Sequence, residues 1–160
     1  MACGGWQRLR WWSTGGEMGA GRTITFVIKG KPTPYVRMTR RGKWVKPEAI
    51  RYLNSKAAVA VQMRGQMKGR EKFGKEPLGV KLTFCYERGA DHRRDLDNEI
   101  KAMLDAANGI VWEDDRWVDE IVAGRPMDSH DEDYVFMEVW VRLDADWQPP
   151  APGVQDPHAR

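Results

Sequence analysis

Hydrophobic positions along this chain follow two periods, and segments with each period alternate. Four short segments show the strand pattern, either as a β-branched run or as apolar and polar residues in strict alternation. The first lies directly before a run of prolines and cations, and the last precedes a proline-rich end. These predicted strands are Thr23–Ile28, Val80–Tyr86, Val118–Ala123 and Val135–Val141.

Two further segments show the period of a helix. Pro47 suits the first turn of a helix, and helical spacing continues from there to Met67, so we expect a helix over about Glu48–Met67. A second helix of about three turns begins at Asp97 or Asn98 and ends at Asn108-Gly109, a typical helix stop. The predicted core positions of the first helix are Ile50, Leu53, Ala57 and Val61, with its other Ala and its Met residues, and those of the second are Ile100, Met103, Leu104 and Ala107.

The resulting order is β-α-β-α-β-β, which predicts an α+β fold with a small mixed β-sheet and two helices. The remaining ends, residues 1–21 and 145–160, have compositions typical of disordered extensions. We therefore expect one folded domain over residues 22–144, which suits a chain of 160 residues.

Composition narrows the class of protein. Apolar residues make up 41% and charged residues 31% of the chain, as in soluble globular proteins. No apolar run is long enough to cross a bilayer, and the N-terminal segment lacks the apolar stretch of a secretory signal. The two cysteines, Cys3 and Cys85, argue against a disulfide framework. These features predict a cytoplasmic protein with no membrane partner.

Charge is distributed unevenly along the chain, although the net charge is only +3. The segment from Lys29 to Lys46 contains seven basic residues and no acid, and Tyr35 and Trp44 lie among them. Cations mixed with aromatic residues favour contact with nucleic acid. A run of this kind is also compatible with a merely solvated surface.

Carboxylates gather in the second half of the chain. Asp95-Leu96-Asp97-Asn98-Glu99-Ile100-Lys101 follows Arg93-Arg94, and Asp105 and Asp114-Asp115 come soon after. Carboxylates are ligands for a hard divalent cation. Carboxylates beside cations suggest a metal site that acts on a phosphate ester.

Local geometry favours an extended segment at the start of this motif. Residues two apart point in nearly opposite directions on a helix but to the same side of an extended segment. We therefore expect Asp95 and Asp97 on one side of an extended stretch before the helix, with Leu96 turned to the core. Lys101 would project beside Asp97 one turn later, and Asp114-Asp115 would precede a strand next to the same site.

Simpler interpretations remain open for each part of the motif. Asp95–Asn98 could be a helix cap, Asp114-Asp115 a turn, and Asp97 with Lys101 a solvated pair; Asp105 alone reads as a helix-surface residue. In that case the protein would be a non-catalytic nucleic-acid-binding module. A phosphatase or sugar transferase with an Asp-x-Asp motif is a third alternative, although such motifs usually follow a hydrophobic strand and this one follows a charged loop.

The joint order of these residues resembles the RusA family of Holliday-junction resolvases over about Thr23–Leu143. The basic run with its prolines, Gly30-Lys31-Pro32-Thr33-Pro34 and Arg37–Trp44, contributes to the resemblance. The most specific part is Arg94-Asp95-Leu96-Asp97-Asn98, Lys101, Leu104-Asp105-Ala106, Asn108-Gly109 and Asp114-Asp115.

The resemblance implies a homodimeric endodeoxyribonuclease that depends on Mg²⁺, with Mn²⁺ as a substitute, and nicks four-way DNA junctions symmetrically in recombination and repair. It implies that Asp95, Asp97 and Asp115 are catalytic metal ligands, with Asp114 beside them, and that Lys101 is a catalytic or DNA-contacting lysine. The residues expected to bind DNA are Arg93, Arg94, Lys31, Arg37, Arg40, Arg41 and Lys43.

Overall fold

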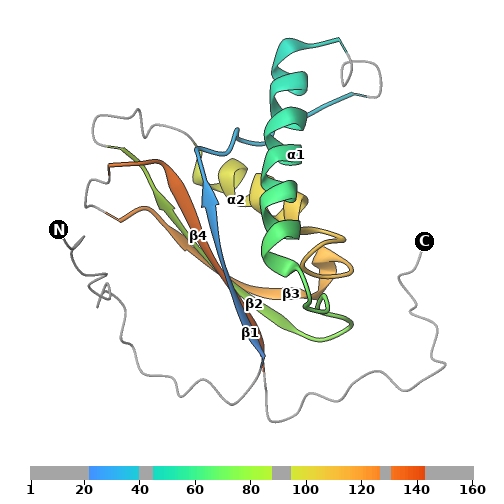
Figure 1. Cartoon of the computed structure of the whole chain (residues 1–160). Helices are drawn as coiled ribbons and strands as arrows, with labels where there is room; N and C mark the ends of the chain where they lie inside the picture. Colours follow the sequence, from blue (N-terminus) through green and yellow to red (C-terminus); the bar gives the residue numbers. More distant parts are fainter. Residues whose placement is uncertain (1–21, 40–44, 88–94, 127–130, 143–160) are drawn as a thin grey trace.

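The computed structural model describes residues 22–39, 45–87, 95–126 and 131–142. The two predicted extensions, residues 1–21 and 145–160, lie outside this part of the chain. The described residues form a four-stranded sheet with two helices (Figure 1). The predicted α+β class and the order of its elements are therefore confirmed.

The sheet is mixed. Its strands are β1 (Thr23–Lys29), β2 (Leu78–Cys85), β3 (Val118–Gly124) and β4 (Tyr134–Val141), arranged in the order β1-β4-β2-β3. The central strand β4 pairs antiparallel with both neighbours, whereas β2 and β3 run parallel. A parallel pair needs a crossover connection, and the second helix supplies it.

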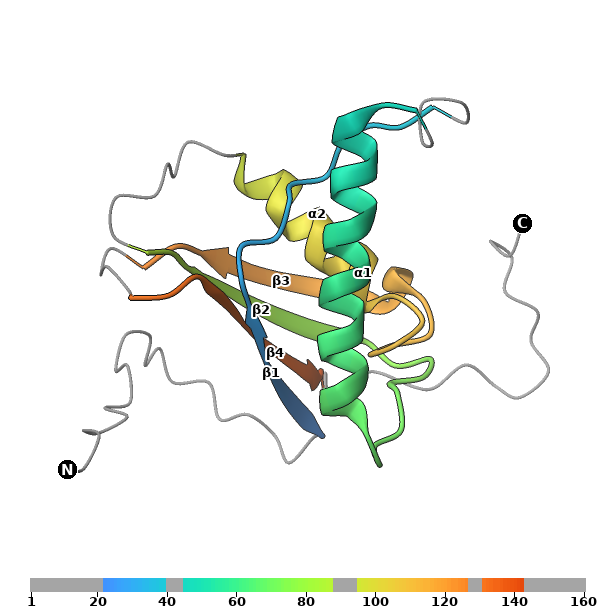
Figure 2. The ribbon, with the colours of Figure 1, turned by 45° about the horizontal axis from the view of Figure 1, so that its top comes forward.

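The two helices, α1 (Pro47–Met67) and α2 (Leu96–Ala107), cover the same face of the sheet. Figure 2 shows α2 running behind α1, above β3 and β2. A short 3₁₀ helix, η2 (Asp115–Trp117), leads from the turn after α2 into β3.

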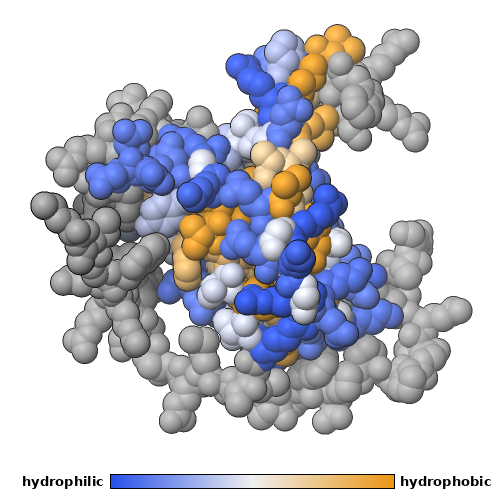
Figure 3. Space-filling model, viewed as in Figure 1, coloured by the Kyte–Doolittle hydropathy of each residue, from blue (hydrophilic) through white to orange (hydrophobic). Residues whose placement is uncertain are grey.

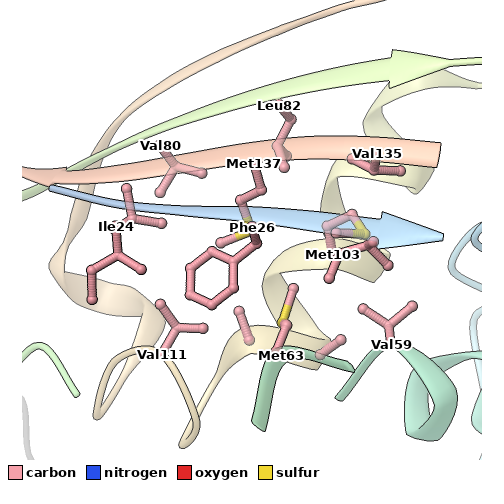
Figure 4. Packing of buried hydrophobic residues seen from close by; sticks show 14 of the residues in the cluster. Ile24, Phe26, Val59, Met63, Val80, Leu82, Met103, Val111, Val135 and Met137 are labelled. Atoms are coloured by element: carbon pink, nitrogen blue, oxygen red, sulfur yellow. The ribbon is translucent and has the colours of Figure 1, made fainter. Parts of the chain in front are cut away.

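The core lies between the helices and the inner face of the sheet. Alternate residues of β1, β2 and β4 point inward and are buried, as their alternating sequences predict. Figure 4 shows Phe26 of β1 and Met137 of β4 facing Met63 of α1, with Val111 beside them. Trp112, in the turn after α2, is fully buried and is among the largest core side chains.

The predicted core face of α1 is wrong. Ile50 is 41% exposed and Val61 is 63% exposed. The buried positions are Ala49, Tyr52, Val59, Met63 and Met67, so of the predicted positions only Ala49 and the two Met residues are buried, while Ala57 and Ala58 are exposed. Apolar residues lie on two sides of this helix, and periodicity alone does not decide which side meets the sheet. Figure 3 shows hydrophobic surface at the upper end of α1, beyond the sheet.

Helix α2 is turned by about one residue relative to its prediction. Its buried residues are Glu99, Ala102, Met103, Ala106 and Ala107, whereas Ile100 and Leu104 are half-buried. The buried side of α2 therefore includes a glutamate, whereas the sequence predicted a purely apolar side.

No helix in the described ranges has the length and apolar character that a membrane crossing requires.

Candidate functional site

The motif that begins with Asp95 lies where the chain enters α2. Asp95 has an extended backbone and precedes the helix, and its carbonyl accepts a hydrogen bond from the backbone N–H of Glu99 at 3.3 Å. Because the helix begins at Leu96, Asp97 already belongs to its first turn. The extended arrangement predicted for Asp95–Asp97 is therefore wrong beyond Asp95. The Asp95 side chain makes no capping hydrogen bond, and it is the Asp95 carbonyl that accepts a hydrogen bond from the N–H of Glu99.

Both carboxylates of this first turn are exposed to solvent. Asn98 donates a hydrogen bond from Nδ2 to Oδ2 of Asp95 at 3.3 Å. The remaining oxygen lone pairs of Asp95 and those of Asp97 face outward, as ligands for a cation would have to do.

A buried ionic network lies directly beneath this turn. Glu99 is completely buried; its Oε1 accepts a hydrogen bond from the Tyr86 hydroxyl at 2.6 Å, and its Oε2 pairs with the Arg125 guanidinium at 2.6 Å. Tyr86 follows β2 and Arg125 follows β3, so the network joins the ends of two strands to the start of α2. Burial and the hydrogen bond to Glu99 raise the pKa of Tyr86 well above its usual range.

Sequence reasoning missed this network. Glu99 was treated as part of an acidic run, yet it stands three, four and seven positions before Ala102, Met103 and Ala106, on their face of the helix. That spacing could have shown from the sequence that Glu99 lies on the buried side of the helix. Its partner Arg125 carried no signal, because only the fold brings the end of β3 to this place.

The first part of the basic segment packs against the same end of α2. The backbone N–H of Tyr35 donates to the carbonyl of Asn98 at 3.0 Å, and that of Thr33 donates to Ser55 Oγ of α1 at 2.9 Å. The Lys31 ammonium lies over the Tyr86 ring, 4.5 Å from its centroid. Arg37, two residues after Tyr35, is exposed. Two of the predicted DNA-binding cations therefore belong to a segment fastened beside Asp95 and Asp97.

Lys101 has a partner other than the one expected. Its Nζ lies 4.1 Å from the centroid of the Tyr35 ring, which also makes an edge contact with Tyr52 at 5.5 Å. Lys101 stands one turn after Asp97 on α2, but the described residues show no ion pair between them. Tyr35 supports this lysine and packs on α1, so its ring is not a free stacking platform for a base.

Asp105 is more than a helix-surface residue. Its Oδ2 accepts a hydrogen bond from the Tyr52 hydroxyl at 2.7 Å, and this contact joins α2 to α1. Burial, followed by the bond to Asp105, raises the pKa of Tyr52 above its usual range.

Asp114 and Asp115 lie at the other end of α2. Asp114 caps η2 through the backbone N–H of Arg116 at 3.1 Å and pairs with the guanidinium of the same residue at 3.3 Å. Asp115 is the first residue of η2 and is exposed. The role of Asp114 is therefore partly that of a turn-forming residue, as the simpler interpretation proposed.

The fold keeps these two carboxylate pairs apart within one chain. Helix α2 has 12 residues, and a helix of that length extends about 18 Å. Strand β3 starts after η2 and runs back along α2 until Arg125 meets Glu99 in its first turn. Within the described ranges, no three side chains of His, Cys, Asp or Glu come together as a metal-binding group.

Five of the residues expected to bind DNA lie outside the described part of the chain. They are Arg40, Arg41, Lys43, Arg93 and Arg94.

Comparison with known protein families gives a match to the endodeoxyribonuclease RusA family over residues 26–139. A comparison with curated proteins found no relative. The family match includes β2, β3, both helices, both carboxylate pairs and most of β1 and β4. It confirms the resemblance noted from the sequence, and the chain belongs to the RusA family of endodeoxyribonucleases.

Proposed function

We propose that this protein is a Mg²⁺-dependent, structure-selective endonuclease that resolves four-way DNA junctions by paired symmetric nicks. The observation that carries the proposal is the family match over nearly the whole described fold. It is supported by the cationic segment hydrogen-bonded to the helix turn that bears Asp95 and Asp97. A polyanion held by that segment lies beside carboxylates, as phosphodiester hydrolysis requires.

The donor chemistry at the start of α2 fits magnesium. Mg²⁺ is usually held by one or two carboxylates together with waters and phosphate oxygens. Asp95, just before the helix, and Asp97, in its first turn, each offer one exposed carboxylate. When bound there, Mg²⁺ would polarise the phosphodiester and lower the pKa of an attacking water.

The chain's own residues supply binding and charge compensation. Lys31 and Arg37, with the predicted cations on either side of them, would hold the phosphate backbone and offset the repulsion between DNA and the carboxylates. Lys101 rests on the Tyr35 ring, one turn from Asp97, where its ammonium can offset negative charge that develops on the phosphate.

We infer further that a second copy of the chain completes the carboxylate set. Asp115 is predicted to be a metal ligand, yet in one chain it lies a helix length away from Asp95 and Asp97. In a two-fold dimer, the η2 region of one chain can lie beside the α2 start of the other, and the symmetry then produces two equivalent sites. Two such sites suit the two equivalent strands of a junction.

Cleavage of a labelled four-way junction tests the nuclease proposal. The wild-type protein should cut the junction in Mg²⁺, whereas Asp97→Asn should lower the cleavage rate by at least 100-fold, since it removes a charged metal ligand. Binding of the junction in Ca²⁺ should change by less than about threefold, because Asp97 contacts metal and not DNA.

Glu113→Gln is the matched control, since Glu113 is an exposed acid near η2 with no predicted role. It should cut like the wild type. Junction binding by the wild type without any cleavage would instead favour the non-catalytic DNA-binding alternative, and full activity of Asp97→Asn would refute the site assignment.

A further inference from the structure

A second cationic surface lies between α1 and the C-terminal half of α2, and only its Lys56 end adjoins the Lys31–Arg37 segment, through Ser55. Two adjoining hollows with volumes of about 410 and 320 Å³ meet here and share Arg64, Gly109 and Ile110 in their linings. Five cations line the two hollows together: Lys56, Arg64, Lys68, Arg70 and Lys72. We call this surface the second basic surface.

The segments that carry the second basic surface are held in place by α1 and by the core. Lys56 and Arg64 belong to α1, and Arg70 follows a turn closed by a hydrogen bond from its N–H to the Met67 carbonyl at 2.8 Å. The next anchor is Phe73, which is fully buried and exchanges backbone hydrogen bonds with Val111 and Glu113. The turn that carries Arg70 and Lys72 is therefore pinned at both ends to the helix and to the core.

Cations outnumber acids in this region: five cations line the two hollows, and Glu71 lies between Arg70 and Lys72 in the sequence. The one acid that lines either hollow is Asp105, and that carboxylate already accepts the Tyr52 hydroxyl bond. Over the residues that the structure describes, none of the five cations forms an ion pair. Gathering like charges around one concavity costs repulsion, so the arrangement is suited to an anionic partner that comes from outside.

The spread of the cations indicates a polyanion instead of a single phosphate group. They are divided between two open hollows and extend from the middle of α1 to the turn after it. A DNA backbone presents evenly spaced charges along such a path.

The position of the surface suggests which DNA it meets. The Lys31–Arg37 segment and Lys101 lie towards the start of α2, whereas the second basic surface adjoins Gly109 and Ile110, beyond the end of that helix. Lys56 follows Ser55, to which the Lys31–Arg37 segment is hydrogen-bonded, but Arg64 lies nine residues, or about 14 Å, further along α1, and Arg70 and Lys72 come after its end. Cations spread in this way can contact a second duplex that diverges from the first at a branch point. A straight duplex lying along the first surface need not reach the other.

We propose that the second basic surface binds the phosphate backbone of a second arm of branched DNA, and that it thereby contributes to preference for branched over linear DNA. This inference rests on the proposed function and adds a binding surface that the carboxylate motif and the Lys31–Arg37 segment do not include.

The test compares binding of a four-way junction and of a linear duplex with equal numbers of base pairs, in Ca²⁺, over a series of salt concentrations. The triple variant Arg64→Gln, Arg70→Gln, Lys72→Gln should lose at least tenfold in junction affinity and less than threefold in duplex affinity. The slope of log K against log salt should fall by about 2 to 3 for the junction, since each lost phosphate contact contributes about 0.9. Circular dichroism and the thermal midpoint verify folding.

Lys81→Gln is the control, because Lys81 lies on β2 with its side chain on the face of the sheet away from the helices. It should bind like the wild type. Unchanged junction affinity and slope in the triple variant would overturn the inference, as would an equal loss for junction and duplex. The nuclease proposal is tested separately, by whether the wild type cuts junctions. If the wild type binds junctions but never cuts them, the nuclease proposal fails, while the binding data still decide the role of the second basic surface.

Discussion

Glu99 illustrates how one charged residue can organise a site without facing it. Its carboxylate is completely buried between a tyrosine hydroxyl and a guanidinium, directly below the turn that presents Asp95 and Asp97. A buried charge is tolerated only when it is paired and hydrogen-bonded. The network therefore holds the first turn of α2 against the ends of β2 and β3.

Removing this charge should destabilise the protein strongly. Glu99→Ala leaves Arg125 without its anion and Tyr86 without its acceptor, so we expect the free energy of unfolding to fall by about 3–5 kcal/mol. Glu99→Gln retains the shape of the side chain and should cost about 1–3 kcal/mol. Urea denaturation measures both losses.

The control for Glu99 is Glu120→Gln, which removes a partly exposed pair with Arg142. It should cost no more than about 1 kcal/mol. If the Glu99 and Glu120 variants lose equal free energy of unfolding, the buried network stabilises the fold no more than an exposed ion pair does.

Buried tyrosines predict an alkaline limit to stability. Burial, together with a hydrogen bond to Cys85, raises the pKa of Tyr134 to about 12, and burial with carboxylate contacts also raises the pKa values of Tyr52 and Tyr86. In the unfolded chain tyrosine titrates near about 10. The unfolded chain loses these protons first, so stability is complete below that pH and declines as pH rises towards the folded-state pKa values.

Urea midpoints at several pH values between 8 and 11.5 would measure this decline. The double variant Tyr86→Phe, Tyr134→Phe should show a shallower dependence on pH above 10, because two of the three linked tyrosines are gone. The Cys85 thiol, whose pKa burial also raises, remains in both proteins. A dependence as steep as that of the wild type would contradict the assignment.

At the scale of elements, side-chain contacts hold the two helices together, attach α1 to β1 and join neighbouring strands on the outer face of the sheet. Tyr52 joins α1 to α2 through Asp105, and Gln62 and Gln66 of α1 hydrogen-bond to the backbone of β1. On the outer face of the sheet, the Trp140 ring of β4 lies over Gly79 of β2, where a side chain on that glycine would collide with the ring. This position needs a glycine for space.

Gly79→Ala should therefore destabilise the protein by about 1–3 kcal/mol, the usual cost of overpacking. An alanine within a strand would otherwise be at least as favourable as glycine. In a Trp140→Val background the same change should cost less than about 1 kcal/mol, because the ring is absent. Thermal unfolding of the wild type, the two single variants and the double variant measures the coupling energy between the two positions. If Gly79→Ala costs the same stability with and without the Trp140 ring, the collision is not its cause.

At the scale of the whole molecule, the inferred shared site makes a prediction about mixed dimers. Asp97→Asn and Asp115→Asn should each be inactive alone. If one chain supplies Asp95 and Asp97 while its partner supplies Asp115, a mixed dimer of the two variants has one fully mutated site and one intact site. Mixing the variants should then restore single nicks in a labelled junction, without the paired nicks of the wild type.

The control is a mixture of Asp97→Asn, or of Asp115→Asn, with a protein that carries both substitutions. Neither mixture can form an intact shared site. Such mixtures should remain inactive. If Asp97→Asn and Asp115→Asn mixed together, under conditions in which the subunits exchange, recover no nicking at all, each site would have to be formed within a single chain.

Much of this protein could be predicted from local pattern. The strands, the extents of both helices and the mixed α+β class follow from short-range periodicity, since alternation and helical spacing report which residues can share a face. The family resemblance was also readable, because the order Asp95, Asp97, Lys101, Asp114, Asp115 is a property of the chain itself.

Tertiary structure decided the questions that concern pairing over long distances. Which side of α1 meets the sheet depends on packing, so Tyr52 and Val59 are buried while Ile50 and Val61 are exposed. Only the parallel course of β3 beside β2 brings Arg125 to Glu99 and leaves Asp115 at the far end of α2. Sequence determined the elements and the kind of chemistry, because both depend on neighbouring residues; the fold determined which charges meet, because that depends on where distant segments come to lie.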